Sequence, residues 1–230
     1  MRLNRADVLD GAMALLEAEG LEGLTMRRLA ASLHVQPGAL YWHFTDKKAL
    51  LDAMADRMLA GVDDGVDGAL PWDLRATELA VRLRAALRAH RDGARIQAGT
   101  FGALPNTLRV GDALLRTFLD AGLSEQTAGT AIFSLLYYIL GHTIEEQARD
   151  ELVAADKWPP AADAIDANEY PQLAHVKQTL EAANDDERFR DGLEIFLDGI
   201  RDRSTAVSGA TSPAETSLTA KQTEAKPAEH

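Results

Sequence analysis

Residues 25–44 read TMRRLAASLHVQPGALYWHF, and the rest of the expected architecture is built outward from them. Thr25 is a preferred N-cap residue, and the helix expected after it places its leucines on one inward face while its arginines stay in solvent. Pro37 disfavours helical geometry at the residue before it and is common in the first turn of a helix. The segment therefore predicts two short helices joined by a tight turn, the second running from Pro37 to about Phe44.

The second of these helices carries more ring-bearing side chains than so short a segment can bury. Leu40 can pack inward, while Tyr41, Trp42 and His43 project rings that form hydrogen bonds. Two crossed helices with a polar and aromatic second helix are typical of a helix-turn-helix, whose second helix enters the major groove of DNA. The alternative is that Tyr41 and Trp42 are core aromatics beneath a three-helix cluster.

The same region resembles a known family. Residues 20–48, followed by ALLDAM and including the string YWHF-x-x-KK-x-LL, are similar to the DNA-binding domain of TetR-family transcriptional repressors. Three later segments resemble the regulatory domain of that family in order and spacing: HRDGA at 90–94, AGT at 98–100 and IEEQ at 144–147. The resemblance covers most of residues 4–202. It implies a ligand-responsive repressor that binds a palindromic double-stranded DNA operator as a homodimer.

The expected DNA-binding residues come from both helices of the pair, the turn between them and the start of the following helix. Basic side chains beside the reading helix would contact phosphates, and the ring tips would reach phosphates or base edges. The full set is Thr25, Arg27, Arg28, Gln36, Pro37, Gly38, Ala39, Tyr41, Trp42, His43, Lys47 and Lys48.

The charge balance of the chain opposes general affinity for polyanions, because the formal net charge is −12. The excess acid lies away from the proposed reading helix. Residues 1–60 hold seven Lys and Arg against eight Asp and Glu, so this region is almost neutral. The absence of cysteine excludes disulfides and thiolate chemistry and suits a reducing cytoplasm.

Neither a signal peptide nor a membrane segment is expected. The N-terminal segment breaks up its apolar residues with acids at helical spacing. The longest apolar run, residues 128–144, is shorter than the roughly twenty residues that a bilayer requires, and Glu145 follows it directly. We interpret this run as a helix buried on nearly all sides, in a cytoplasmic protein.

The expected fold class is all-α. Residues 1–46 form a three-helix helix-turn-helix domain, 47–61 a connecting helix, and 62–203 a larger helical domain for ligand binding and dimerisation. Residues 204–230 are Ser, Thr, Ala, Pro and Glu without periodicity, and we expect them to be disordered. Helices within the larger domain are expected over 72–90, 108–121, 124–148, 172–182 and 186–203, with loops over 61–71 and 152–171.

An apolar stripe on the last helix is a candidate for dimerisation. Phe189, Leu193, Phe196 and Ile200 fall at helical spacing. Together with the helix over 128–144, this stripe could supply two helices from each chain to a four-helix interface. The alternative is that both helices close the core of the single chain.

Catalysis is not expected, because the sequence has no nucleophile elbow, phosphate-binding glycine loop or HExxH motif. His142 and Glu145 lie three residues apart on one helical face, where they could bind a divalent ion or form a buried hydrogen bond. Tetracycline-binding members of the TetR family hold a magnesium chelate with a histidine and, through water, a glutamate. Glu145 matches that glutamate, but Gln97 stands where the histidine would be, and its amide is a poor magnesium ligand. We therefore expect no cofactor.

The ligand site implied by the resemblance is apolar and aromatic with a few polar tips. Such a lining suits a planar hydrophobic inducer, such as an antibiotic or a polyketide. For each residue, plain core packing is the alternative. A rival class is an all-α small-molecule binding protein, or a magnesium-dependent helical enzyme, without DNA binding. The expected lining is Leu79, Leu83, Gln97, Thr100, Phe101, Ile132, Tyr137, Tyr138, His142 and Glu145.

Overall fold

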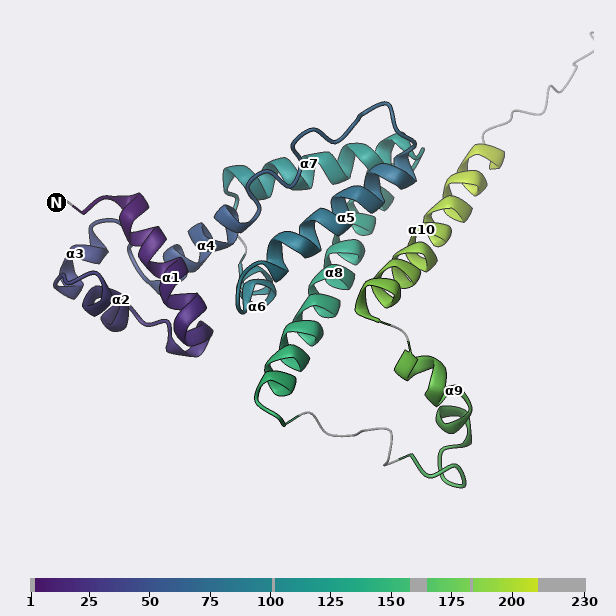
Figure 1. The fold of residues 1–230 in the computed structure, drawn as a ribbon. Coiled ribbons are helices and arrows are strands. Elements are labelled where there is room, and N and C mark those ends of the chain that lie inside the picture. The colour runs from purple at the N-terminus through teal and green to yellow at the C-terminus, as the bar shows by residue number, and fades with distance from the viewer. Residues whose placement is uncertain (1–2, 101, 158–164, 183, 211–230) are drawn as a thin grey trace, which may run out of the picture.

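The computed structural model describes residues 3–100, 102–157, 165–182 and 184–210, and these residues form helices and no strand. The expected all-α class is therefore confirmed. Figure 1 shows α1 to α4 grouped at one end of the molecule, with the longer helices α5, α7, α8 and α10 beside one another. The helices are α1 Arg5–Gly23, α2 Met26–Ser32, α3 Pro37–Tyr41, α4 Lys47–Met58, α5 Trp72–Arg88, α6 Gly93–Ala98, α7 Pro105–Asp120, α8 Glu125–Ala154, α9 Pro171–Ala182 and α10 Asp185–Ala210.

The first two helices begin at side-chain caps, and the cap of the second, Thr25, was expected from the sequence. Asn4 starts α1 with a capping box: its side chain accepts from the backbone N–H of Asp7 at 3.0 Å, and Asp7 accepts from the Asn4 N–H. Thr25 accepts from Arg28 N at the start of α2. Gly20 interrupts α1 with a φ of +70°, a conformation that glycine adopts without strain.

The N-terminal helices share a core of their own. Leu16, Leu29 and Leu40 are fully enclosed in it, together with Met54 of α4. Ile96 also belongs to this cluster, although it comes from α6. The larger part of the chain therefore inserts a side chain into the core of the smaller part.

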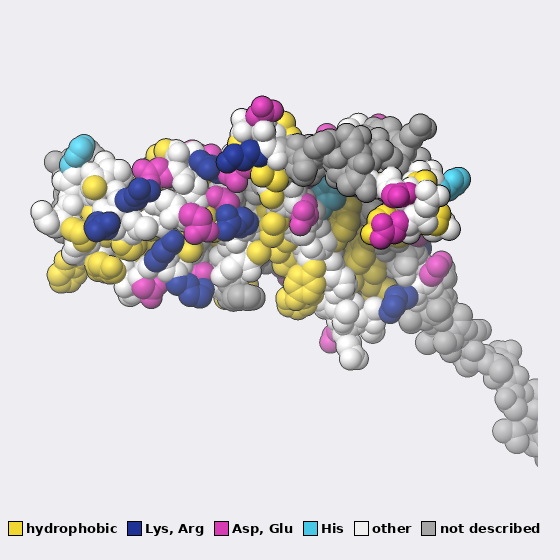
Figure 2. All heavy atoms as spheres, turned by 90° about the horizontal axis from the view of Figure 1, so that it is seen from below, with side chains coloured by type: hydrophobic (Ala, Val, Ile, Leu, Met, Phe, Trp, Pro, Cys, Tyr) yellow, Lys and Arg dark blue, Asp and Glu magenta, His cyan; other side chains and the backbone are white. Residues whose placement is uncertain are grey.

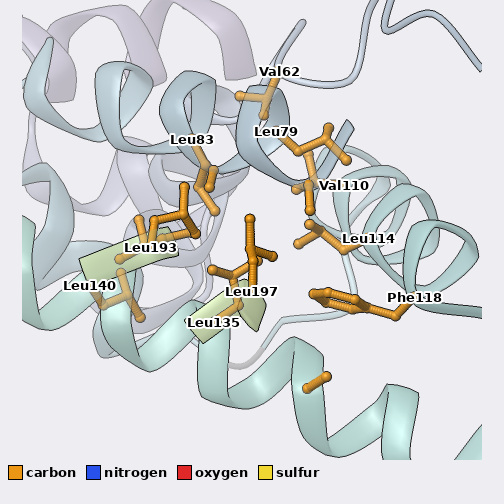
Figure 3. Close-up of a cluster of buried hydrophobic side chains, with 14 of the residues drawn as sticks. Val62, Leu79, Leu83, Val110, Leu114, Phe118, Leu135, Leu140, Leu193 and Leu197 are labelled. Carbon is orange, nitrogen blue, oxygen red and sulfur yellow. The ribbon is translucent and has the colours of Figure 1, made fainter. Parts of the chain in front are cut away.

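A second core lies between α5, α7, α8 and α10. Figure 3 shows its leucines and Phe118 pointing toward a common centre from these helices and from the segment after α4. Phe189, Leu193 and Ile200 of the expected dimerisation stripe are buried in this core, and Phe196 packs edge-on against Phe118 with ring centroids 6.3 Å apart. The stripe thus closes the core of the single chain, which was the alternative interpretation.

The expectation that α8 is buried on nearly all sides is wrong. Phe133 and Tyr137 are exposed on α8, with ring centroids 6.2 Å apart, and Ile195 of α10 is 75% exposed. The helix is also longer than its apolar run, and by length and composition it matches a bilayer-spanning helix. Its buried residues contribute to the second core, as those of a core helix do.

Several boundaries differ from the expected ones. The connecting helix α4 ends at Met58, so the three residues before 62 form turns. The last helix continues to Ala210, well into the segment expected to be disordered. Residues 211–230 lie outside the described residues, as do 158–164 of the expected loop and Phe101 of the expected ligand site.

Candidate nucleic-acid interface and ligand region

Helix α3, the expected reading helix, is anchored by two side chains and exposes two others. Leu40 and Phe44 are buried in the N-terminal core, with exposed fractions of 0% and 1%. Tyr41 is 50% exposed and Trp42 is 89% exposed, so neither ring closes the interior. The alternative of two core aromatics is therefore wrong. Because α3 begins at Pro37 and ends at Tyr41, these rings stand at the end of a short helix.

The turn before α3 is tight and leaves its surface open. His34 adopts a φ of +56°, and Val35 N donates to Ala30 O at 2.9 Å. Gln36, Pro37 and Gly38 are exposed. A methyl group added at Gly38 would meet nothing within 4 Å apart from its chain neighbours and the backbone of its own helix, so another molecule can approach this backbone closely.

The basic side chains around α3 have acidic neighbours. Lys48 is exposed and its Nζ atom donates to both carboxylate oxygens of Asp52, at 2.8 and 3.0 Å. Arg28 is exposed and pairs with Glu19, whereas Arg27 is exposed on the same turn of α2. Figure 2 shows Lys and Arg side chains spread over the end of the molecule that holds the N-terminal helices, with acids among them.

The remaining expected DNA contacts are less open. Ala39, His43 and Lys47 are half-buried, and the exposed Thr25 uses its hydroxyl oxygen as a helix cap. The His43 carbonyl accepts a hydrogen bond from Arg5 Nη1 at 2.8 Å, and that guanidinium lies 4.1 Å from the centroid of the Phe44 ring. Arg5 therefore fixes the end of α3 to α1.

Two carboxylates join the N-terminal helices to the larger part of the chain. Asp92 is buried, with a φ of +56°, and its Oδ2 atom accepts from Leu21 N at 2.7 Å. Asp56 of α4 reaches the first turn of α7. Its Oδ1 atom accepts from the backbone N–H groups of Asn106 and Thr107, at 2.8 and 2.9 Å.

Asp56 acts as a helix cap from another element. The residue before α7 is Leu104, whose apolar side chain cannot satisfy the free N–H groups of that helix, so a carboxylate from α4 does so instead. Asn106 adds a side-chain contact, because its Nδ2 atom donates to Asp56 Oδ2 and to the Asp56 carbonyl, both at 2.9 Å. Neither Asp56 nor Asp92 was singled out from the sequence, because nothing local in the chain marks a partner fifty or more residues away.

The expected ligand residues do not surround one cavity. Leu79 and Leu83 belong to the second core, and Ile132 packs against it. Tyr137 is exposed, Gln97 is buried, and the Thr100 hydroxyl donates to Ile96 O at 2.8 Å. Tyr138, His142 and Glu145 line a cavity of about 410 Å³ together with Gly141, Glu146, Arg149, Asp185 and Arg188.

His142 faces a different glutamate from the expected one. Its Nδ1 atom lies 3.3 Å from Glu146 Oε2, whereas Glu145 is exposed. Its ring also packs on Phe189, as does the ring of Tyr138, whose hydroxyl donates to Phe189 O at 2.8 Å. Burial raises the pKa of Tyr138. Among the described residues, no three acidic, His or Cys side chains are grouped as a metal ion would require.

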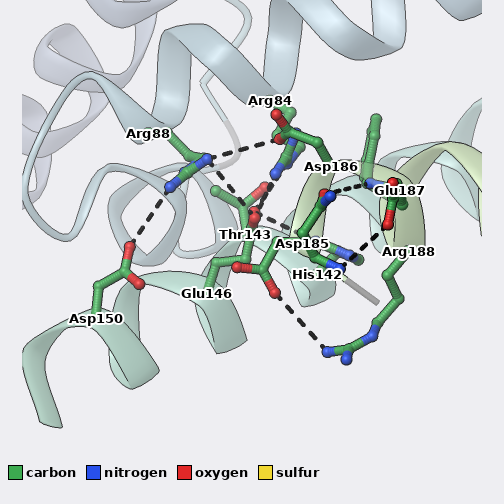
Figure 4. A network of polar contacts seen from close by, with 12 residues as sticks. Arg84, Arg88, His142, Thr143, Glu146, Asp150, Asp185, Asp186, Glu187 and Arg188 are labelled. Atoms are coloured by element: carbon green, nitrogen blue, oxygen red, sulfur yellow. Dashed lines mark hydrogen bonds and ion pairs between the residues drawn. The ribbon is translucent and has the colours of Figure 1, made fainter. Parts of the chain in front are cut away.

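A buried ion-pair network lies beside this cavity and was not predicted. Figure 4 shows Arg84 of α5 directed at Glu146 of α8 and at Asp186 of α10. Arg149 likewise pairs with Asp185, and hydrogen bonds from Arg149 lower the pKa of that carboxyl group. One indication of this ion-pair network is present in the sequence, because the charged Arg84 follows Leu83 within the apolar stripe of α5.

A larger cavity, of about 500 Å³, lies between the segment after α4, the start of α5 and α7. Of the expected ligand residues, it contains Leu79. Arg75 lines it and is buried, although the expected lining omitted it. A signal was present, because Arg75 falls at the position in the stripe of Leu79, Leu83 and Leu87 that an apolar residue would normally occupy. The full lining is Asp63, Val66, Gly68, Arg75, Leu79, Leu108, Arg109, Asp112, Ala113, Arg116 and Thr117.

Comparison with known proteins finds a matching family model for each of the two parts of the chain. The family model "Bacterial regulatory proteins, tetR family" matches residues 8–54, and the model "Tetracyclin repressor-like, C-terminal domain" matches residues 66–204. The chain is 36% identical, over 92% of its length and 97% of the relative, to the tetracycline repressor protein class A from transposon 1721 of Escherichia coli.

Two solved structures resemble the fold over most of the chain. ActR from Streptomyces coelicolor in complex with (S)-DNPA is 28% identical with a TM-score of 0.77, covering 88% of this chain and 99% of that one. BioQ with its natural double-stranded DNA operator is 31% identical with a TM-score of 0.67, covering 86% of this chain and 98% of that one.

Proposed function

Because the chain belongs to the TetR family of bacterial regulatory proteins, we propose that it is a homodimeric transcriptional repressor that a small molecule releases from its operator. In this proposal α3 is the reading helix, and the two copies in a dimer enter successive major grooves about 34 to 36 Å apart. The relatives are regulators, and we propose no catalytic reaction for this chain. Its place of action would be the cytoplasm, where the DNA is.

The observation that best supports the proposal is the difference in burial between the two sides of α3. Leu40 and Phe44 hold the helix to its core, while Tyr41 and Trp42 project into solvent. Exposing large aromatic rings to water is unfavourable, so their position is explained by a partner that receives them. The open backbone at Gly38 allows that partner to come close.

Two-fold symmetry would come from the exposed apolar side chains of α8 and α10. Phe133, Tyr137 and Ile195 are exposed, and a groove between these helices continues the surface over Ala131, Phe196 and Ile200. An isologous contact through this face would bury them and bring four helices together.

The inducer would act by preferring one arrangement of the two parts over the other. A ligand in the larger part can shift the equilibrium only if it binds that arrangement more tightly. The Asp56 cap and the Leu21–Asp92 hydrogen bond are the contacts through which such a preference would reach α3. BioQ has been crystallised with its operator and ActR with a small molecule, which supports both halves of this cycle for our chain.

Fluorescence anisotropy with DNA from the region upstream of its own gene tests the proposal. We expect the protein to bind this DNA, and Tyr41→Ala to abolish binding while the dimer stays folded by circular dichroism and sedimentation. Tyr170→Ala is the matched control, because Tyr170 is exposed to a similar degree but lies near α9. Unimpaired binding by Tyr41→Ala would contradict the role assigned to α3. The rival class, a small-molecule binding protein or magnesium-dependent enzyme without DNA binding, is not favoured.

A further inference from the structure

One side of α3 faces away from the protein, and this surface begins at the residue before the helix. Gln36, Pro37 and Gly38 are exposed, as are Tyr41 and Trp42 one turn later. Because an α-helix has about 3.6 residues per turn, residues one turn apart lie on the same face. In helix-turn-helix proteins the first residues of the reading helix contact base edges. The residues from Gln36 to Gly38 are therefore placed to select the base pairs of an operator.

The first turn of α3 is apolar. Pro37 has neither a backbone N–H nor a polar side chain, and Gly38 has no side chain at all. The space beside Gly38 is open, so the edge of a base can come close to the Pro37 ring. The apolar group that identifies a base in the major groove is the 5-methyl group of thymine. Pro37 can therefore recognise a thymine by packing against its methyl group.

The side-chain amide of Gln36 is free to bind another molecule. Gln36 is the N-cap residue of α3, but its side chain makes no capping hydrogen bond and has no partner within the part of the chain that the structure describes. The neighbouring N-cap residues differ, because the side chains of Thr25 and Asp46 accept hydrogen bonds from their own helices. A glutamine amide binds adenine through two hydrogen bonds: its oxygen accepts from N6 and its nitrogen donates to N7.

The side chains that select G·C pairs are missing from the same surface. Guanine is most often read by arginine or lysine, and cytosine by a carboxylate. The segment from Gln36 to Trp42, QPGALYW, contains neither kind of side chain. The two arginines of α2 belong to the helix that crosses the DNA backbone in this motif, and Arg28 pairs there with Glu19. The exposed side of α3 thus favours A·T pairs over G·C pairs.

We propose that α3 selects A·T base pairs in each half of the operator, through an adenine bound by Gln36 and a thymine methyl group packed on Pro37. Because these residues are adjacent in the chain, the two bases lie in the same base pair or in neighbouring ones. The proposal rests on the proposed function and names the base pairs that the same interface reads. Gln36 and Pro37 determine specificity, whereas Lys48 contributes affinity for any sequence.

Base analogues that each lack one recognition group test the two contacts. DNase I footprinting of the DNA upstream of the gene locates the palindrome, which is then synthesised with one analogue at matched positions of both halves. Deoxyuridine lacks the thymine methyl group, and 7-deazadeoxyadenosine lacks the N7 acceptor. Fluorescence anisotropy at a fixed salt concentration measures the affinity of the full-length protein for each DNA.

We expect one thymine in each half-site at which deoxyuridine lowers the affinity about fifteen-fold, which is about four-fold for each of the two methyl groups. At an adenine in the same or the neighbouring base pair, 7-deazadeoxyadenosine should lower the affinity at least about ten-fold. Analogues at the other positions of the palindrome should have smaller effects.

Two variants assign each loss to its residue. Pro37→Ala removes the ring and keeps a good helix former, so the deoxyuridine loss should disappear while the 7-deazadeoxyadenosine loss remains. Gln36→Ala should show the reverse pattern. Lys48→Ala is the control, because it should weaken binding to every DNA and retain both losses. Circular dichroism and sedimentation check that the variants remain folded dimers.

The wild-type protein alone can refute the proposal, because the analogue series needs no variant. Binding that neither deoxyuridine nor 7-deazadeoxyadenosine weakens at any position would overturn it, as would losses found only with 7-deazadeoxyguanosine. A deoxyuridine loss that persists in Pro37→Ala would overturn the role of that residue. The absence of any binding to upstream DNA would instead refute the proposed function, and the reading of A·T pairs with it.

Discussion

Arg84 and Glu146 meet inside the helical bundle, where Arg84 Nε donates to Glu146 Oε2 at 2.8 Å and the two residues are 7% and 3% exposed. The hydrogen bond from Arg84 to Glu146, followed by that to Asp186, raises the pKa of Arg84 further above its usual range. The guanidinium also lies 4.8 Å from the centroid of the Phe189 ring. One side chain therefore joins α5, α8 and α10.

Removing one partner of this pair should cost more than removing both. We expect Glu146→Leu to lower the free energy of unfolding by about 3 to 5 kcal/mol, because it removes the buried partner of Arg84 and leaves only the exposed Asp186 to pair with that buried charge. The double variant Arg84→Met/Glu146→Leu should be more stable than Glu146→Leu. Urea unfolding at one protein concentration measures both, with the exposed Glu145→Leu as control. Simple additivity of the two substitutions would contradict the pairing.

We expect low pH to weaken the ion pair between Arg149 of α8 and Asp185 at the start of α10. Hydrogen bonds from Arg149 lower the folded-state pKa of Asp185 below its ordinary value of 3.8. A depressed carboxyl pKa stabilises the fold above the unfolded pKa, and this stabilisation is lost as pH falls through the folded pKa. The difference in Tm between the wild type and Asp185→Asn should thus be constant above about pH 5 and shrink below about pH 4.

The control for this experiment is Glu194→Gln, an exposed position on the same helix. Its difference from the wild type should remain small across the range. A Tm difference for Asp185→Asn that grows toward acid pH would have the wrong sign for a hydrogen-bonded carboxylate.

The ion pair between Lys48 and Asp52 limits how much Lys48 contributes to DNA binding. Lys48→Ala should weaken binding to any DNA sequence and reduce the slope of log K against log salt by up to about one. Asp52→Asn should strengthen binding, because it removes the carboxylate that holds the Lys48 ammonium group. Anisotropy over a salt series measures both slopes. Lys157→Ala, at an exposed lysine beyond the end of α8, should change neither; an effect as large as that of Lys48→Ala would show general charge attraction instead.

The exposed face of α8 and α10 should determine the oligomeric state. We expect Ile195→Glu to convert a dimer to a folded monomer, because a carboxylate on this face would be desolvated in the dimer without a partner. Analytical ultracentrifugation measures the change. Leu74→Glu, at an exposed leucine on α5, is the control. A dimer that survives Ile195→Glu intact would place the interface elsewhere.

Local chemistry was enough to predict the helix-turn-helix. The Thr25 cap and the break before Pro37 depend on neighbours within a few residues, and the structure shows both of them. The exposure of Tyr41 and Trp42 followed from the same argument, because so short a helix cannot bury every ring that it carries.

Contacts between distant segments could not be predicted in this way. Hydrophobic periodicity identified the apolar stripe of α10 but could not say whether it faces its own chain or another. The family resemblance selected Leu79 and Leu83 as ligand contacts and passed over Arg75 in the same stripe, since similarity in sequence does not show which side chains face the cavity. The capping of α7 by Asp56 requires the tertiary arrangement itself.

The location of Ile96 in the N-terminal core has a consequence for protein engineering. A chimera can join the DNA-binding helices of another protein to the larger part of this chain. Those helices must then leave a space in their core that fits the isoleucine side chain. If that space is missing, the isoleucine side chain is exposed to solvent at the junction, and the new DNA-binding helices lose their fixed orientation relative to the larger part. The residues that surround this isoleucine lie far from any base pair, and they would therefore decide which DNA-binding helices can be combined with which larger parts.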